Sequence, residues 1–329
     1  WLAARGRPGT VKFFGAPAEE GGGGKVYMVR AGLFRDVDVA VTWHPGDGNH
    51  VTRATSLANV TAKFRFRGKS AHAAAAPEQG RSALDGVEAM NAMVNLMREH
   101  VPAETRIHYV ITNGGRAPNV VPDFAEVYYY ARHSDMRLLD GIWERIRNAS
   151  KGAALGTGTE VEEEVVNAVY NTLPNDALAD VMQKALDRVG GVRYSPEEER
   201  FAAEMKKTLS GAIPPAGTEA RILPAEGGVA SISTDVGDVS WVVPTVQLSA
   251  ATWVPGTPAH SWQAVAAGGM SIGTKGMMVA AKAMALTAIE LYATPSEIAR
   301  AKAEFATRVG DFRYVSKVGD RKPPLDYRK

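Results

Sequence analysis

A block of alternating strand and helix patterns in the middle of the chain constrains the fold more than any other feature. Over residues 60–67, apolar and polar side chains alternate with the period of two that a half-buried strand requires. The next patterned segments are a helix over 84–101, strands over 105–112 and 125–131, a helix over 136–154 and a strand over 160–167. The order β-α-β-β-α-β predicts a ferredoxin-like α+β sandwich of roughly 110 residues.

The segments on either side of this block follow a different pattern. Ahead of it we expect strands at 11–16 and 39–44 around a short helix at 25–31, and behind it two helices, strands at 229–233 and 245–249 and a long final helix from Ser271. A strand, a helix and a second strand are typical of an α/β unit. We therefore predict an α/β domain made of residues 1–52 and 174–329, interrupted by an inserted α+β domain at 53–173. The charged tail after Gly310 is expected to be a surface arm.

Composition excludes several classes of partner. The 38 Lys and Arg residues nearly balance 36 Asp and Glu, so the formal net charge is only +2. A binder of nucleic acid or of anionic membranes would show a basic stripe instead. We find no signal peptide and no apolar run near the roughly 20 residues that span a bilayer, and we expect a cytoplasmic protein. Cysteine is absent, so any metal site must use His and carboxylate ligands.

The first candidate site is the pair Glu19-Glu20, which precedes four glycines at 21–24. It would lie at the carboxyl end of a predicted strand, where open α/β sheets bind ligands. Adjacent carboxylates repel each other unless they share a cation or a proton. With a metal, one carboxylate can be a ligand while the other acts as general base. A solvated acidic pair before a flexible loop is the alternative. A phosphate-binding loop is disfavoured by the two acids and by the lack of a GxxxxGK[ST] pattern.

Two histidines extend this candidate site. His44 ends another predicted strand, and His260 lies in a loop before the last helix. Imidazole and carboxylate groups from several strand ends suit zinc or manganese. Each histidine alone is more often a structural or surface residue than a metal ligand.

A further group of polar residues lies in the inserted domain: His72, Asn119 and Arg132. An arginine can bind a substrate carboxylate through two hydrogen bonds, and His or Asn can donate to a developing oxyanion. A capping Asn and exposed cations are the alternative. Ser-His-Asp catalysis fits poorly, because no GxSxG segment is present.

Taken together, these motifs closely resemble the aminoacylase/carboxypeptidase-G-type metallopeptidase family. The resemblance covers nearly the whole chain, in the family's order, and rests on residues 9–11, 17–21, 43–45, 68–73, 119–122 and 258–260. Residues 233–245 are similar to a branch that hydrolyses p-aminobenzoyl-glutamate. The resemblance implies a zinc-peptidase-like α/β catalytic domain with two divalent metals, Zn or Mn. It also implies that the inserted ferredoxin-like domain is a lid through which the protein forms a homodimer.

The resemblance assigns a role to each candidate. Glu19 would be the general base, and Glu20, His44 and His260 would be metal ligands. The lid residues His72, Asn119 and Arg132 would meet the substrate's amide and carboxylate, in part within a partner's active site. The implied reaction is hydrolysis of the amide bond of an N-acyl amino acid.

The chain departs from the family pattern at its start. Family members carry an upstream segment with further metal ligands, whereas here the earliest usable acid is Glu19 and the earliest histidine is His44. We therefore expect an incomplete copy, truncated or complemented by a second polypeptide, in which the metal site is partial. The alternative function is a non-catalytic or regulatory subunit that keeps the fold and binds acyl-amino-acid ligands or a partner subunit.

Overall fold

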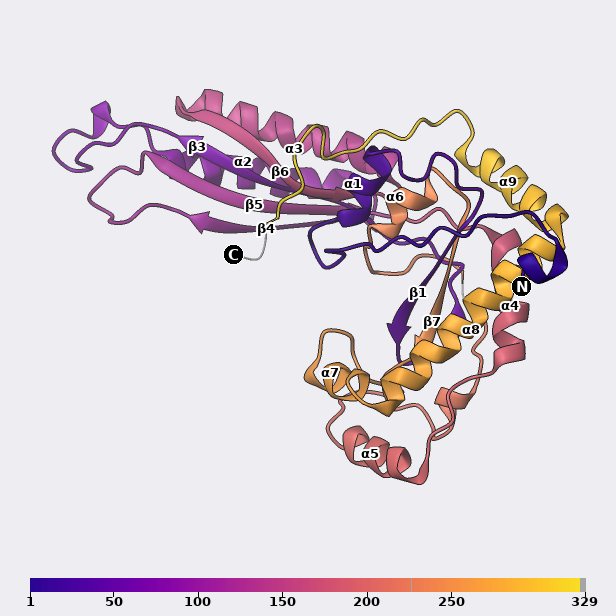
Figure 1. The fold of residues 1–329 in the computed structure, drawn as a ribbon. Helices are drawn as coiled ribbons and strands as arrows, with labels where there is room; N and C mark the ends of the chain where they lie inside the picture. The colour runs from indigo at the N-terminus through magenta and orange to yellow at the C-terminus, as the bar shows by residue number, and fades with distance from the viewer. Residues whose placement is uncertain (226, 326–329) are drawn as a thin grey trace.

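The chain folds into an elongated lid, residues 58–169, that projects from a larger lobe. The computed structural model describes residues 1–225 and 227–325. The large lobe is built from the chain before and after the lid. The lid and the large lobe together form an L (Figure 1).

The lid is a four-stranded antiparallel sheet with two helices packed on one face. Its elements are β3 (Ala58–Arg67), η2 (Pro77–Gln79), α2 (Ala83–Met97), η3 (Arg98–His100), β4 (Arg106–Asn113), β5 (Phe124–His133), α3 (Met136–Thr157) and β6 (Glu160–Val169). The sheet order is β4-β5-β3-β6. This order, with the helices in the two crossovers, confirms the predicted ferredoxin-like sandwich.

Local sequence explains why the lid forms these elements. On β3 the apolar side chains at alternate positions are buried in the core under the helices, and Phe64 and Phe66 are fully buried. Ser82 caps α2 by accepting a hydrogen bond from the amide of Asp85, and Gly158 ends α3 in the left-handed conformation that glycine tolerates.

The large lobe contains a three-stranded sheet and most of the helices. Its elements are η1 (Ala3–Arg5), α1 (Gly24–Arg30), β1 (Ala40–Gly46), β2 (His50–Val51), α4 (Asp176–Val189), α5 (Pro196–Lys206), η4 (Thr218–Ala220), α6 (Val236–Ser240), β7 (Thr245–Ala251), α7 (Trp262–Gly268), α8 (Ser271–Ala293) and α9 (Pro295–Val309). The sheet order is β1-β7-β2, with β1 and β7 parallel. Helices α4 and α8 pack against β7 and against each other.

Helix α8 corrects the expectation that no apolar run is long enough to cross a bilayer. By length and composition, Ser271–Ala293 is long and apolar enough to cross a membrane, and 33% of its most apolar stretch is buried. Core helices of soluble proteins can have the same length and composition, and α8 packs on β7 and α4. One such helix is therefore only a weak indication of a membrane span.

Two predicted strands are wrong. Residues 11–16 lie in irregular structure, with Phe13 95% exposed, and residues 229–233 form only one bridge, between Val229 and Thr55. A strand needs a neighbour to receive its backbone hydrogen bonds, and within the described residues neither segment has a full-length one.

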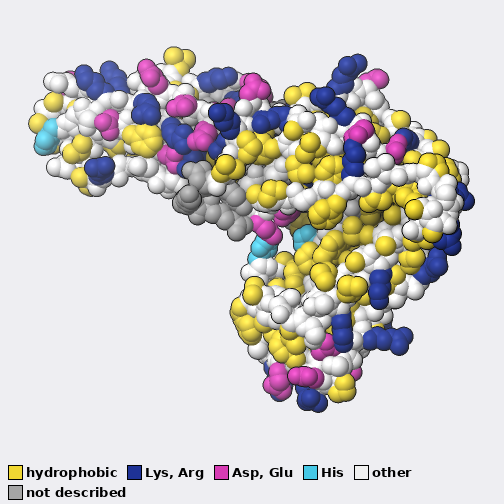
Figure 2. Space-filling model, viewed as in Figure 1, with side chains coloured by type: hydrophobic (Ala, Val, Ile, Leu, Met, Phe, Trp, Pro, Cys, Tyr) yellow, Lys and Arg dark blue, Asp and Glu magenta, His cyan; other side chains and the backbone are white. Residues whose placement is uncertain are grey.

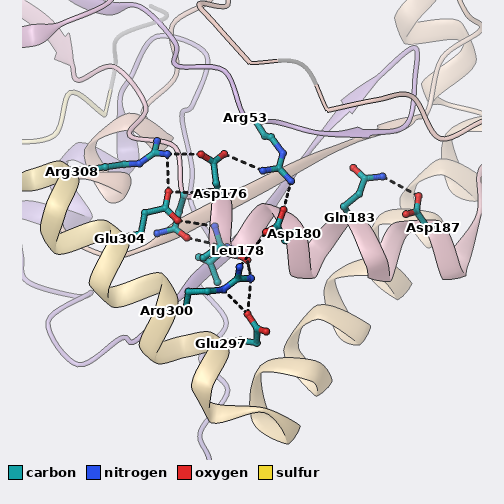
Figure 3. A network of polar contacts seen from close by, with 12 residues as sticks. Arg53, Asp176, Leu178, Asp180, Gln183, Asp187, Glu297, Arg300, Glu304 and Arg308 are labelled. Atoms are coloured by element: carbon teal, nitrogen blue, oxygen red, sulfur yellow. Dashed lines mark hydrogen bonds and ion pairs between the residues drawn. The ribbon is translucent and has the colours of Figure 1, made fainter.

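The long helix predicted from Ser271 is confirmed as α8, and a further helix, α9, follows it after a break at Thr294 and Pro295. Proline at the first position of a helix fits there but cannot continue the preceding one. An ion-pair network fixes α9 to α4 (Figure 3). In it Arg308 meets Asp176, while Arg53 meets Asp176 and Asp180. This network ties together the two points where the chain enters and leaves the lid. The domain boundaries at 53 and 173 stay a prediction.

The segment after Gly310 is not a surface arm in its described part. Val318 is buried in the lid's core cluster, and the Arg321 guanidinium donates to the carbonyls of Val165 and Val166 on β6. The hydroxyl of Tyr314 donates to Asp238 on α6 over 2.6 Å. The segment therefore bridges the lid and the large lobe. Residues 326–329 lie outside the described residues.

Candidate active site

The loop that carries Glu19 and Glu20 leads directly into α1. Ala18 adopts a positive φ of 60°, which is unfavourable for a residue with a side chain. Glycine is required at Gly24, because a Cβ there would lie 2.0 Å from the carbonyl oxygen of Pro17. The loop is thus a tight, specifically shaped turn.

Glu19 is held by the segment ahead of α6. The hydroxyl of Thr234 donates to Oε1 of Glu19 over 2.8 Å. The next residue, Asp235, pairs with Lys25 at the far end of the same loop, over 2.8 Å. Burial raises the pKa of Asp235, Lys25 opposes this effect, and the charge of Glu19 adds to the rise. The carboxyl groups of Glu19 and Asp235 and the ammonium group of Lys25 therefore lie in one small region.

Glu20 faces His260. Their side chains approach to 3.7 Å between Oε2 and Nε2, and both are more than half exposed. His260 has a φ of 58°, and it and Ala18 are the two non-glycine residues with positive φ in the described part of the chain. An exposed ion pair contributes at most about 1 kcal/mol, so it does not explain this strained backbone. Backbone strain of this kind clusters at functional sites.

His44 lies at the carboxyl end of β1, as predicted, but it does not join Glu20 and His260 in one cluster. Its Nδ1 lies 2.6 Å from the carbonyl oxygen of Pro45, which leaves Nε2 as the atom available to a ligand. Among the described residues no three His, Cys, Asp or Glu side chains lie close enough together to hold a metal.

These observations decide how well a divalent metal fits. Carboxylate and imidazole donors are of the kind that zinc and manganese accept. The structure brings two of them together, Glu20 and His260, and leaves His44 separate. The site fits a metal in donor type, and the three-ligand set stays a prediction.

The lid residues fall into two groups at opposite ends of the sheet. His72 and Asn119 lie at the tip, where the amide of Ala73 donates to the carbonyl of Asn119. Arg132 lies near the other end of β5. At 3.4 Å per residue, the stretch of β5 from Phe124 to Arg132 places it roughly 27 Å from the tip. One chain does not bring all three to one place.

Arg132 nevertheless lies at the end of the lid beside the large lobe with an unused donor. Its Nε is buried and has no hydrogen-bond partner among the described residues, and its guanidinium lies 5.6 Å from the ring of Tyr130. Histidine and acidic side chains gather at the notch where the lid meets the large lobe (Figure 2).

Sequence reasoning missed the residues that hold the acidic loop: Thr234, Asp235 and Lys25. The family resemblance had singled out the segment 233–245, but it gave those residues no role. The only signal was a run of polar residues, Ser233 to Asp235, next to a short buried helix.

The comparisons with known proteins agree with this fold. The model of the M20 peptidase dimerisation domain matches residues 58–157, which is most of the lid. The predicted resemblance is confirmed: the lid matches the M20 peptidase dimerisation domain, and most of the chain is similar to proteins of the M20 peptidase family. It is 41% identical over 301 residues to one of the subunits of the p-aminobenzoyl-glutamate hydrolase of Escherichia coli (strain K12), covering 84% of this chain and 63% of that protein.

Two further relatives extend the comparison. The Xaa-Arg dipeptidase of Mus musculus is 30% identical over 240 residues, covering 73% of this chain and 49% of that protein. The crystal structure of an aminobenzoyl-glutamate utilization protein from Klebsiella pneumoniae matches with a TM-score of 0.61 at 21% identity, covering 89% of this chain and 64% of that one. At that identity the match shows a shared fold. The chain spans about half to two thirds of the length of these relatives.

Proposed function

We propose that this chain carries the catalytic carboxylates of a metal-dependent amidohydrolase. The substrate would be an N-acyl amino acid, p-aminobenzoyl-glutamate or a close relative of it. The observation that carries the proposal is the separation of two adjacent acids: Glu19 accepts from Thr234, whereas Glu20 faces His260. Because the two carboxylates have different partners, they can take different roles in one reaction.

In this mechanism Glu19 removes the proton from the attacking water and passes it to the leaving amine. Glu20, His44 and His260 would hold a divalent ion, Zn or Mn, with a second ion as the family implies. Such an ion would polarise the amide carbonyl and lower the pKa of the attacking water. Arg132 binds the carboxylate of the substrate through its unused guanidinium donor.

The lid tip is proposed to act in a partner's active site. His72 and Asn119 lie too far from Arg132 to serve the same substrate within one chain. A homodimer through the lid would carry them to the partner's cleft, where they would stabilise the oxyanion. A second, different subunit is the other arrangement that supplies them. We also propose that the protein works in the cytoplasm.

The test is hydrolysis of a panel of N-acyl glutamates by the purified chain after metal is added back. Glu19→Ala should lower turnover at least about a hundredfold, the contribution of a general base, while ligand binding stays nearly intact. Glu199→Ala, which removes an exposed acid on α5, is the matched control and should keep full activity. Unchanged turnover in Glu19→Ala would refute the assigned mechanism.

A second candidate function is a non-catalytic subunit that binds acyl-amino-acid ligands or a partner subunit. The separation of His44 from Glu20 and His260 favours it. Metal content separates the two candidates. Fewer than one divalent ion per chain after reconstitution, together with retained ligand binding, would support the non-catalytic subunit.

A further inference from the structure

The loop that carries the two acids is built from intrinsically flexible residues. Residues 21–24 are all glycine, and glycine loses more backbone freedom on ordering than any other residue. Within the loop, the amide of Gly21 donates to the carbonyl of Glu19, and the amide of Gly22 donates to that of Ala18. These short-range bonds close the turn but do not restrain the carboxylate of Glu19. Its position must be fixed from outside the loop.

Two consecutive residues hold both ends of this loop. At its start, the hydroxyl of Thr234 donates to Oε1 of Glu19 over 2.8 Å. At its end, Asp235 accepts from the backbone amide of Lys25 over 2.9 Å and from the Lys25 ammonium over 2.8 Å. The glycines therefore lie between two anchored points.

The anchor itself is rigid. The side chain of Asp235 is fully buried, and the five residues of α6 that follow it are buried as well. A Cβ at Gly237 would lie 1.9 Å from the carbonyl oxygen of Tyr170, so α6 sits directly on the chain that leaves the lid. The hydroxyl of Ser240 donates to the carbonyl of Gly237 and accepts from the amide of Leu173.

The direction of the Thr234 hydroxyl is also fixed. Its oxygen accepts from the amide of Val236 over 3.3 Å, so its hydrogen is directed to Glu19. This bond occupies Oε1 of Glu19. It leaves Oε2 as the oxygen that can receive a proton.

We propose that Thr234 and Asp235 are positioning residues for the amide hydrolysis, and this inference rests on the proposed function. Thr234 selects which oxygen of Glu19 faces the attacking water. Asp235 fixes the far end of the loop, so that Glu20 keeps its place beside His260. Neither residue touches the substrate.

The test compares three variants. Thr234→Val removes the hydroxyl and keeps the shape, whereas Thr234→Ser keeps the hydroxyl. Thr287→Val is the control, because the buried hydroxyl of Thr287 also donates a hydrogen bond, to the carbonyl of Ala283 in the middle of α8. Loss of positioning should lower kcat about tenfold to a hundredfold in Thr234→Val and leave KM within about twofold. Thr234→Ser should recover most of kcat, and Thr287→Val should match the wild type.

A second readout does not require activity. Hydrogen exchange of the peptide spanning residues 18–27 should be faster in Thr234→Val and in Asp235→Asn, and unchanged in Thr287→Val. Exchange at the wild-type rate in both site variants overturns the inference, whether or not the protein turns over substrate. So does faster exchange with an unchanged kcat. Faster exchange in a protein whose wild type hydrolyses no member of the panel refutes the proposed function and supports the anchoring of the loop.

Discussion

Asp238 is a buried acid whose ionisation should control the stability of the fold. It lies on α6, fully buried, and accepts hydrogen bonds from the hydroxyl of Tyr314 and the amide of Tyr170. Burial raises the pKa of Asp238 from its ordinary 3.8 to about 7. The hydrogen bonds from Tyr314 and Tyr170 oppose this rise, and the charge of Asp235 adds to it. The folded protein therefore holds a proton between about pH 3.8 and pH 7 that the unfolded chain has released.

The sign of the pH dependence follows from this proton. Where the folded state binds more protons than the unfolded state, the free energy of unfolding falls as the pH rises. The contribution is fully present below the unfolded pKa and is lost as the pH rises through the folded one. At 1.36 kcal/mol per pH unit, the loss between pH 5 and pH 8 is about 2.5 kcal/mol.

Asp238→Asn measures this loss directly, because the amide does not titrate. Unfolding by urea at pH 5, 6, 7 and 8 gives the free energy of unfolding of both proteins. Between pH 5 and pH 8, the free energy of unfolding of the wild type should fall by about 2.5 kcal/mol relative to that of the variant. Asp187→Asn, on the exposed face of α4, should show no such shift. A wild-type minus Asp238→Asn difference that stays constant over this range would refute the reasoning, since a mere change in packing does not depend on pH.

Two further predictions concern the glycine loop and the substrate. Gly24→Ala should destabilise the fold by about 1–3 kcal/mol, because its Cβ would overlap the carbonyl of Pro17. Gly141→Ala, in open space on α3, should instead stabilise the fold by about 0.5–1 kcal/mol. Thermal unfolding of both variants checks that the two effects have opposite signs. Arg132→Ala should raise KM at least about tenfold for an N-acyl glutamate while leaving KM nearly unchanged for its α-methyl ester, and an equal rise for both would exclude a role in carboxylate binding.

The lid was predictable from sequence because its signals are local. The alternation of apolar and polar residues on β3 and the apolar stripe on α2 are periodic over short windows of sequence. The type of each element can therefore be predicted without knowing which elements pack against it. The large lobe was less predictable. A β-rich pattern such as residues 11–16 becomes a strand only where another strand pairs with it, and that requirement lies elsewhere in the chain.

The same distinction applies to the candidate site. Glu20 and His260 were grouped in one candidate site from their residue types and predicted positions, and the structure places their side chains 3.7 Å apart. The partners of Glu19 and Lys25 could not be predicted in this way. Thr234 and Asp235 meet them across more than 200 residues of chain, and no spacing or period encodes such a contact.

The charges around the loop give an independent reason to expect a cation there. Glu19, Glu20 and Asp235 carry three formal negative charges, and the Lys25 ammonium offsets one of them. Like charges held this close raise one another's free energy unless a cation or a proton is shared. The buried Asp235 is already paired with Lys25, whereas Glu20 faces His260 and Glu19 accepts a hydrogen bond from Thr234. A divalent ion would balance these two charges, which is the physical link between the shape of this loop and the proposed metal-dependent chemistry.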